Sequence, residues 1–349
     1  MKPILLRRRE VLRRLLVVSI ALAVYAVLTA GLYHRMTRPG EAAEARVAVV
    51  QGAQPPHRNI AVRDGWFWVD GERLLIASVG WDPVRPGELP WTRTFRAAEI
   101  DRDLAQIRAA GFNAVRSWAP LRPEELALAA RHGIRVLQGI WIDPAGDFAD
   151  PAFRRRTLGE VAQAVEASRW SPAILGYLIL NEPRAAAVAK AGLDETRAFL
   201  REAAAVVRAL DPSAPIGYAS WPGMEALDDP LLDFVAFNLY PHRPRVVMDE
   251  LGLAGYVSLL RRTVARGRPL VISEFGISVS PRGEVQGRGG ASEAEQAAGL
   301  VELAGLFVAG GATGTSVFQW NDGWWKNHDR TGDELEHDPA DPEEWFGLI

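Results

Sequence analysis

The chain has 349 residues, of which 48% are hydrophobic and 24% charged, and this composition excludes a wholly disordered or collagen-like protein. The formal net charge is −3, and the body after residue 38 is mildly acidic, which argues against nucleic-acid binding because phosphate contacts need a concentrated basic face. The sequence contains no cysteine, so disulfides, thiolate catalysis and cysteine-based metal centres are excluded.

The first sixty residues predict a membrane anchor followed by a linker. A basic segment over 1–14 precedes an uncharged apolar run over 15–33, which is long enough to cross a hydrocarbon core of about 30 Å as a helix. The positive-inside rule then places the N-terminus in the cytoplasm and the rest of the chain outside, in the periplasm or beyond. A cleaved signal peptide is the rival interpretation, because Ala-rich residues 42–45 follow. A buried core helix would leave the basic flank unexplained, and residues 34–60 are typical of a linker.

From residue 61 onward, short apolar runs alternate with helical stretches. Residues 66–75 predict a hairpin around Asp70-Gly71, a favoured tight-turn pair. We expect strands over 74–80, 113–118, 135–141, 174–181, 215–220, 233–240, 269–275 and 313–320. We expect helices over 96–110, 122–132, 151–169, 191–210, 252–266 and 292–309.

Eight nearly continuous apolar strands in βα order predict an α/β fold, a closed (β/α)₈ TIM barrel over 61–349. An open doubly wound sheet is less favoured because no glycine-rich nucleotide fingerprint follows the first strand. Only 29 residues follow the last expected strand, so the eighth helix is expected to be short, replaced or missing.

Polar residues close the apolar strands at the edge where barrel enzymes carry their chemistry. Glu182 ends the fourth strand and Glu274 lies at the end of the seventh, so the two carboxyls can converge across the barrel mouth. Burying an unpartnered carboxylate is costly, so two at one mouth indicate a function. Glycoside hydrolysis needs such a pair, one as the acid and one as the nucleophile or base.

The motifs Asn181-Glu182-Pro183 and Ser273-Glu274-Phe275-Gly276 resemble those of clan A glycoside hydrolases, which are retaining β-glycosidases built on TIM barrels. Family 2 is the most similar branch through the hairpin 69–73 and the segment 237–240, and families 5 and 72 are also similar. The chain departs from family 5 at Trp141, where that family has a histidine.

The resemblance implies a role for each matching residue. Glu182 would be the acid/base, Glu274 the nucleophile, and Asn181 a hydrogen-bonding partner of the sugar 2-hydroxyl. It further implies that three residues support the site: Tyr240 by orienting Glu274, Arg116 by holding the nucleophile carboxylate, and Trp320 as the platform under the sugar.

Further aromatic residues fall at strand ends or just beyond them, where an indole can stack on the C–H groups of a sugar. These candidates are Trp81, Trp118, Trp141, Trp221 and Trp324, and each can equally be a packing residue. His242 follows Tyr240-Pro241 and can contact substrate or be a neutral loop residue. No metal or other cofactor is expected, because His328, Asp329, His337, Asp338 and Asp341 lack strict ligand spacing.

The sequence therefore predicts a membrane-anchored retaining β-glycosidase whose substrate is a β-glucan or related polysaccharide. Two alternatives stay open: a transglycosylase that uses the same glutamates, and a non-catalytic carbohydrate-binding subunit of a polysaccharide export machine. The sugar, the linkage and any protein partner stay open as well.

Overall fold

The computed structural model describes residues 58–240, 245–281, 289–326 and 338–349, with side chains described except over 245–251. The chain divides into two units, Met1–Glu44 and Ala45–Ile349, and the described residues all belong to the second. The predicted anchor over 15–33, its basic flank and the linker through residue 57 lie outside them. Within the described ranges, no helix is long and apolar enough to cross a membrane.

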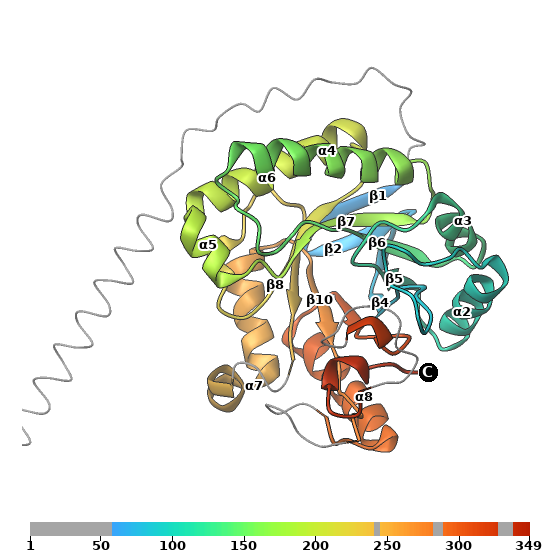
Figure 1. Ribbon diagram of the computed structural model, residues 1–349. Helices are drawn as coiled ribbons and strands as arrows, with labels where there is room; N and C mark the ends of the chain where they lie inside the picture. The colour runs from blue at the N-terminus through green and yellow to red at the C-terminus, as the bar shows by residue number, and fades with distance from the viewer. Residues whose placement is uncertain (1–57, 241–244, 282–288, 327–337) are drawn as a thin grey trace, which may run out of the picture. The chain divides into compact units, whose positions relative to one another are not determined.

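Eight parallel strands close into a barrel, as the apolar runs predict (Figure 1). They are β4 (Ile76–Gly80), β5 (Ala114–Arg116), β6 (Arg135–Ile140), β7 (Ile174–Asn181), β8 (Ile216–Ser220), β9 (Val235–Asn238), β10 (Leu270–Phe275) and β11 (Gly314–Val317). β11 pairs with β4 and completes the ring. Because both faces of the strands are covered, the runs are buried almost throughout, and this explains their lack of alternation.

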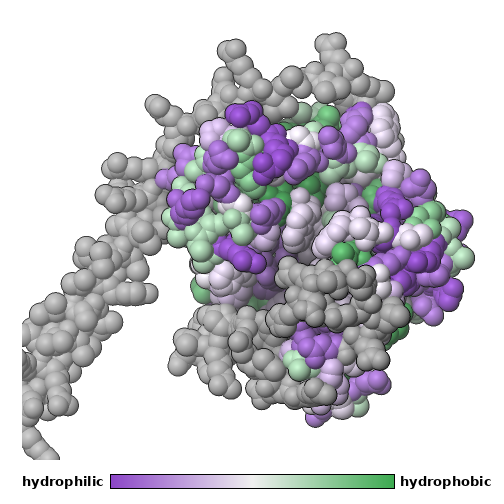
Figure 2. Space-filling view, viewed as in Figure 1, coloured by the Kyte–Doolittle hydropathy of each residue, from purple (hydrophilic) through white to green (hydrophobic). Residues whose placement is uncertain are grey.

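Helices form the outer layer of the barrel (Figure 1). They are α2 (Ala97–Ala109), α3 (Pro123–Arg131), α4 (Pro151–Ser168), α5 (Ala185–Ala191), α6 (Leu193–Leu210), α7 (Arg245–Leu260), which continues into the π-helical turn η2 (Arg261–Ala265), and α8 (Glu293–Gly310). Hydrophilic side chains gather over α4 and α6 on the face that Figure 2 shows. The short helix α5 is not among the expected elements, because seven residues carry too little periodicity to be recognised.

Local signals fix the start of α4 and both ends of α8. The Asp150 carboxylate accepts hydrogen bonds from the backbone of Ala152 and Phe153 and so caps α4. Ser292 and Glu295 form a reciprocal capping box at the start of α8, and Gly311 ends this helix in the left-handed conformation.

No full eighth helix follows β11 within the described residues, as the short C-terminal segment predicts. Two 3₁₀ turns, η3 (Trp324–Lys326) and η4 (Pro342–Glu344), are found there instead. The last residues return to the barrel mouth, where the buried Phe346 ring packs 5.2 Å from Phe318 and 5.9 Å from Tyr240, measured between ring centroids. The C-terminal segment therefore packs against side chains at the carboxyl ends of the barrel strands.

A small antiparallel sheet of β1 (Ile60–Arg63), β2 (Trp66–Val69) and β3 (Glu72–Leu74) precedes the barrel. The predicted hairpin is confirmed, with Asp70 and Gly71 both at positive φ, as a tight turn requires. The sheet packs against residues near the strand starts: Phe67 is fully buried, 5.1 Å from the ring of Phe234. β1 is not among the expected strands: the predicted linker ends at residue 60, and residues 61–63 carry no strand signal without their pairing partner.

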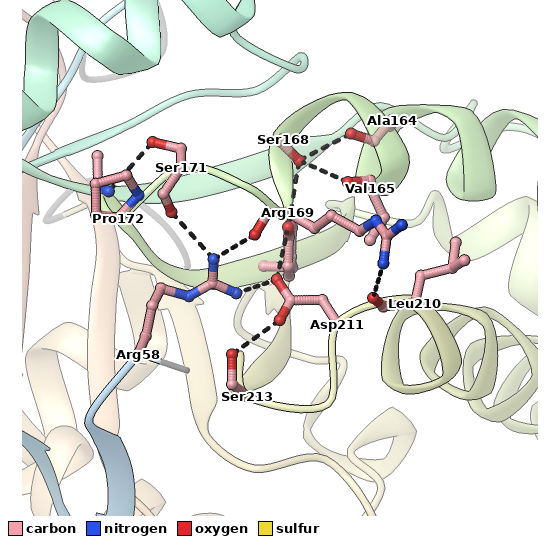
Figure 3. A network of polar contacts seen from close by, with 12 residues as sticks. Arg58, Ala164, Val165, Ser168, Arg169, Ser171, Pro172, Leu210, Asp211 and Ser213 are labelled. Carbon is pink, nitrogen blue, oxygen red and sulfur yellow. Dashed lines mark hydrogen bonds and ion pairs between the residues drawn. The ribbon is translucent and has the colours of Figure 1, made fainter. Parts of the chain in front are cut away.

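A buried polar network ties the segment before β1 to the barrel (Figure 3). Arg58 donates to the carbonyls of Arg169 at 2.7 Å and Ser171 at 3.0 Å, and forms an ion pair with Asp211. Asp211 also accepts a hydrogen bond of 3.1 Å from the hydroxyl of Tyr177. A buried ion pair stabilises a fold only when further hydrogen bonds offset the cost of removing its charges from water. The bonds from Arg58 to the two carbonyls and from Tyr177 to Asp211 do this here. They hold the chain at the ends of α4 and α6, away from the carboxyl ends of the strands.

Candidate active site

The end of β7 presents Glu182 on an unusual backbone. Leu180 and Glu182 both have positive φ, 74° and 46°, which side chains other than glycine rarely adopt. Each such residue costs about 1–3 kcal/mol and persists only where the surroundings hold it. Here the Glu182 N–H donates to the carbonyl of Ala219 at 2.9 Å, and the Trp221 indole donates to the carbonyl of Pro183 at 3.2 Å. The fold therefore holds this strand end in a fixed, strained shape.

Glu274, at the end of β10, accepts hydrogen bonds from three side chains. Its Oε1 accepts from Trp118 Nε1 at 2.7 Å and forms an ion pair with Arg116, and its Oε2 accepts from the Tyr240 hydroxyl at 3.0 Å. Burial, reinforced by the charge of Glu274, raises the pKa of Tyr240 well above its ordinary value, so this hydroxyl keeps its proton and donates. All three partners are donors and one of them, Arg116, is a cation, which matches a carboxylate because a carboxylate only accepts.

Two glycines make room for the Trp118 ring and its backbone. A Cβ added at Gly80 would lie 2.4 Å from the edge of the ring, and one at Gly139 would lie 2.2 Å from the carbonyl oxygen of Ser117. Neighbouring strands thus leave space for the indole to reach Glu274.

A continuous chain of hydrogen bonds joins the two glutamates. Arg116 Nη2 donates to Asn181 Oδ1 at 2.6 Å, and Asn238 Nδ2 donates both to this oxygen at 3.1 Å and to Glu182 Oε1 at 2.9 Å. The Ser273 hydroxyl donates to Asn238 Oδ1 at 2.8 Å and so fixes the orientation of the amide. The predicted residues Arg116, Asn181, Glu182, Tyr240 and Glu274 therefore lie together in one site.

The two carboxyls lie in different electrostatic environments. Burial, helped by the negative charge of Glu274, raises the pKa of Glu182 to about 7, although the hydrogen bond from Asn238 and the charges of Arg116 and Lys326 oppose the shift. Glu182 is therefore suited to hold a proton near neutral pH while Glu274 is surrounded by donors. This is the asymmetry that an acid and a nucleophile require.

The structure corrects two of the predicted sugar contacts. Trp81 is fully buried and donates to Asp103 Oδ2 at 3.1 Å, and Trp320 is 4% exposed and packed in the main core. Neither ring offers a face to a ligand. β11 ends at Val317, three residues before Trp320, so the alternation of the strand does not extend to that ring, and Phe318 instead lies beside Trp118, 5.3 Å between centroids.

The other predicted aromatic contacts differ in exposure. Trp141 is 53% exposed just after β6, while Trp118, Trp221 and Trp324 are half-buried. Trp118 donates a hydrogen bond to the Glu274 carboxylate, a role that its position at a strand end did not predict. His242 lies outside the described residues, and substrate contacts by Trp141, Trp221 and Trp324 stay predictions.

Three polar residues of the site were not among the predicted site residues. Asn238 and Asp82 follow the rule that strand ends carry function, and this rule could have found them. Lys326 lies in η3, where no pattern marks it, and its Nζ lies 3.9 Å from the centroid of the Phe318 ring. Its position depends on the path of the chain after β11, which only the folded structure shows.

The described residues contain no group of three His, Asp or Glu side chains that could hold a metal ion. His328, Asp329 and His337 lie outside them.

Together, the closed barrel and the paired glutamates at its fourth and seventh strands define a barrel of the clan A type. The family model for the TIM barrel domain of glycosyl hydrolases family 2 matches residues 60–296. The chain therefore belongs to glycosyl hydrolase family 2, as the motifs at Glu182 and Glu274 predict. No curated protein sequence matches it.

Solved structures of longer enzymes share the fold. A family 2 β-galacturonidase from Eisenbergiella tayi is 20% identical with a TM-score of 0.63, covering 83% of this chain and 52% of that one. β-Glucuronidases from Ruminococcus gnavus (16% identical, TM-score 0.60) and Dictyoglomus thermophilum (17% identical, TM-score 0.58) each cover 76% of this chain and 47% of their own. The chain thus spans about half the length of these proteins, and at such identities the likeness shows the fold.

Proposed function

We propose that this protein is a retaining β-glycosidase that hydrolyses a β-glucan or related polysaccharide by double displacement. The observation that carries the proposal is the hydrogen-bonded chain from Glu182 through Asn238, Asn181 and Arg116 to Glu274. It couples one carboxyl of raised pKa to a second carboxyl that three donors stabilise.

In the first step, Glu274 attacks the anomeric carbon while Glu182 gives its proton to the leaving glycosidic oxygen. The products are a covalent glycosyl ester on Glu274 and the released alcohol. Esterification removes the negative charge of Glu274, and this charge is one cause of the raised pKa of Glu182. The pKa of Glu182 therefore falls, and Glu182 can take a proton from the water that hydrolyses the ester.

Asn181 is suited to the position next to the nucleophile. Its Oδ1 is occupied by Arg116 and Asn238, so the amide group is oriented with Nδ2 available to donate. A hydrogen bond from this nitrogen to the sugar 2-hydroxyl would strengthen as charge develops at the anomeric carbon. The exposed Trp141 ring supports a polysaccharide substrate, because an indole at the mouth can stack on a further sugar unit.

The test is a screen of β-1,3-, β-1,4- and β-1,6-glucans and mannan with product sizing, together with variants of the two glutamates. Glu274→Ala should show no turnover. Glu182→Ala should be rescued by azide on an activated aryl glycoside, with the β-azide as product, because the ester still forms and azide needs no general base. An α-configured azide would contradict the retaining assignment.

The same measurements separate the alternatives. Longer oligosaccharides among the products would indicate transglycosylation, in which a sugar acceptor replaces water. A carbohydrate-binding subunit would be favoured if neither the wild-type protein nor Glu274→Gln shows turnover and Glu274→Gln keeps its biological function.

A further inference from the structure

Two charged side chains at the barrel mouth are not used by the proposed mechanism. Asp82 lies two residues after the end of β4. Between them is Trp81, whose backbone N–H donates to the carbonyl of Arg116 at 2.8 Å. Lys326 follows β11, the strand that pairs with β4. The Trp320 N–H donates to the carbonyl of Gly80 at 2.8 Å, so the two chain segments leave the barrel side by side.

Lys326 is close to the nucleophile. Its Nζ lies 3.9 Å from the Phe318 centroid, and the Phe318 ring is in edge contact with Trp118, the donor to Glu274. Lys326 and Asp82 are both half-buried. The Lys326 ammonium lies over two aromatic rings, 3.9 Å from the centroid of Phe318 and 5.6 Å from that of Trp325. Each side chain is therefore partly exposed, and a ring face does not use the N–H donors of an ammonium group in conventional hydrogen bonds.

Both groups are charged near neutral pH. Burial raises the pKa of Asp82 to about 6, opposed by Arg93 and Lys326, and lowers the pKa of Lys326 to about 8, opposed mainly by Glu274 and Asp82. Between these values Asp82 is a carboxylate and Lys326 is an ammonium group.

The surrounding charges leave no positive surplus. Even when Glu182 is protonated, the carboxylates outnumber the cations. The cations are Arg93, Arg116 and Lys326, and the carboxylates are Asp82, Glu125, Glu274 and Asp341. Arg93 is bound to Glu125 at 2.6 Å and Arg116 to Glu274, so neither guanidinium is free to neutralise a further anion. A substrate carboxylate beside Lys326 would also experience the charge of Asp82.

We infer that Asp82 and Lys326 form the sugar-selecting end of the site, with the Asp82 carboxylate accepting from, and the Lys326 ammonium donating to, hydroxyls of an uncharged sugar. The inference rests on the proposed glycosidase function and deepens it. It assigns this chain a neutral glycone, in contrast to the uronic acids named for the solved family 2 structures of similar fold.

The experiment uses matched aryl glycosides that differ only at C6: β-glucoside against β-glucuronide, and β-galactoside against β-galacturonide. We expect kcat/KM to favour the neutral member of at least one pair by about tenfold or more, since like charges in a desolvated site repel strongly. Asp82→Asn should reduce this ratio about tenfold by removing the repelling charge. Lys326→Gln should lower kcat/KM on the neutral substrate by about tenfold without gain on the uronide.

Asp194→Asn and Lys190→Gln are matched controls, because these side chains are 68% and 70% exposed on outer helices, and they should leave the ratio unchanged. The inference would be overturned if the wild-type protein prefers the uronide and Lys326→Gln abolishes this preference. Lys326 would then be a residue that binds the substrate carboxylate. An unchanged ratio in Asp82→Asn would also overturn it.

Binding gives a readout that does not need turnover. Isofagomine and its C6-carboxylate, compared by calorimetry, should show the same preference for the uncharged compound. If no glycoside is hydrolysed but this preference holds and Asp82→Asn reduces it, the proposed function fails and the assignment of the sugar-selecting end stands. Tighter binding of the carboxylate would contradict the assignment whether or not the protein is a hydrolase.

Discussion

Glu182 and Glu274 are the same kind of side chain in two environments. Glu182 receives one hydrogen bond from a neutral amide, whereas Glu274 receives donors from an arginine, an indole and a phenol. Burial therefore raises the pKa of Glu182, while both oxygens of the Glu274 carboxylate have hydrogen-bond donors. The difference arises from residues on β5 and β9 and just beyond them, not from the two motifs themselves.

The raised pKa of Glu182 predicts the alkaline limb of the activity profile. Because Glu182 must be protonated to give its proton to the leaving group, kcat/KM should fall as pH rises through about 7. In Asn238→Ala this fall should occur at higher pH, because the hydrogen bond from Asn238, which lowers the pKa of Glu182, is then lost. A pH profile on an aryl glycoside measures both, and a limb below pH 5 in the wild-type protein would contradict the assignment.

Trp118 gives a second residue-level prediction. Trp118→Phe keeps an aromatic ring but removes the Nε1 donor to Glu274, a charge-assisted bond of about 1.5–3 kcal/mol. We expect kcat to fall about 10- to 100-fold with little loss of stability. Trp170→Phe, at a ring 44% exposed, is the control and should retain full activity. Equal rates in the two variants would show that the indole does not support the nucleophile.

At the scale of the element, Gly139 and Gly159 differ in whether the packing around them requires a glycine. Gly139 lies in β6, where an added Cβ would be 2.2 Å from the carbonyl oxygen of Ser117 and 2.6 Å from the carbonyl group of Trp118. Gly159 lies in α4 with open space around its Cβ position. The strand glycine is required by the close approach of β5, while the helix glycine is not required by packing.

Gly139→Ala should therefore destabilise the protein and lower kcat, because the backbone that carries Trp118 has to move. Gly159→Ala should stabilise it by up to about 1 kcal/mol, since alanine favours a helix interior, and should leave kcat unchanged. Denaturant unfolding and steady-state rates measure the two quantities. A neutral Gly139→Ala would contradict the close packing at Trp118.

At the scale of the whole molecule, we propose that residues 15–33 anchor the barrel to a membrane with the active site outside the cytoplasm. The full chain should sediment with membranes, resist extraction at high pH and be released by detergent, because an uncharged run of this length is stable in a bilayer. A chain starting at residue 45 should stay in the supernatant. Recovery of the full-length barrel without residues 1–33 would indicate a cleaved signal instead.

The barrel and the two glutamates were predictable because their signals are local. Each buried strand is a short apolar run, and Glu182 and Glu274 directly end such runs. The βα order then fixes which strands face each other, so the convergence of the glutamates follows from topology. The capping residues Asp150 and Ser292 are local in the same way.

Only the tertiary structure decided which of the predicted tryptophans lie at the site, and that Lys326 lies there too. Trp81, Trp320 and Trp118 all follow barrel strands, yet the first two are buried in the core and the third donates a hydrogen bond to Glu274. Past a strand end, the direction of a side chain depends on contacts between segments far apart in the sequence. Lys326 reaches the mouth for this reason, through the path of the chain after β11, and neither periodicity nor spacing encodes such a path.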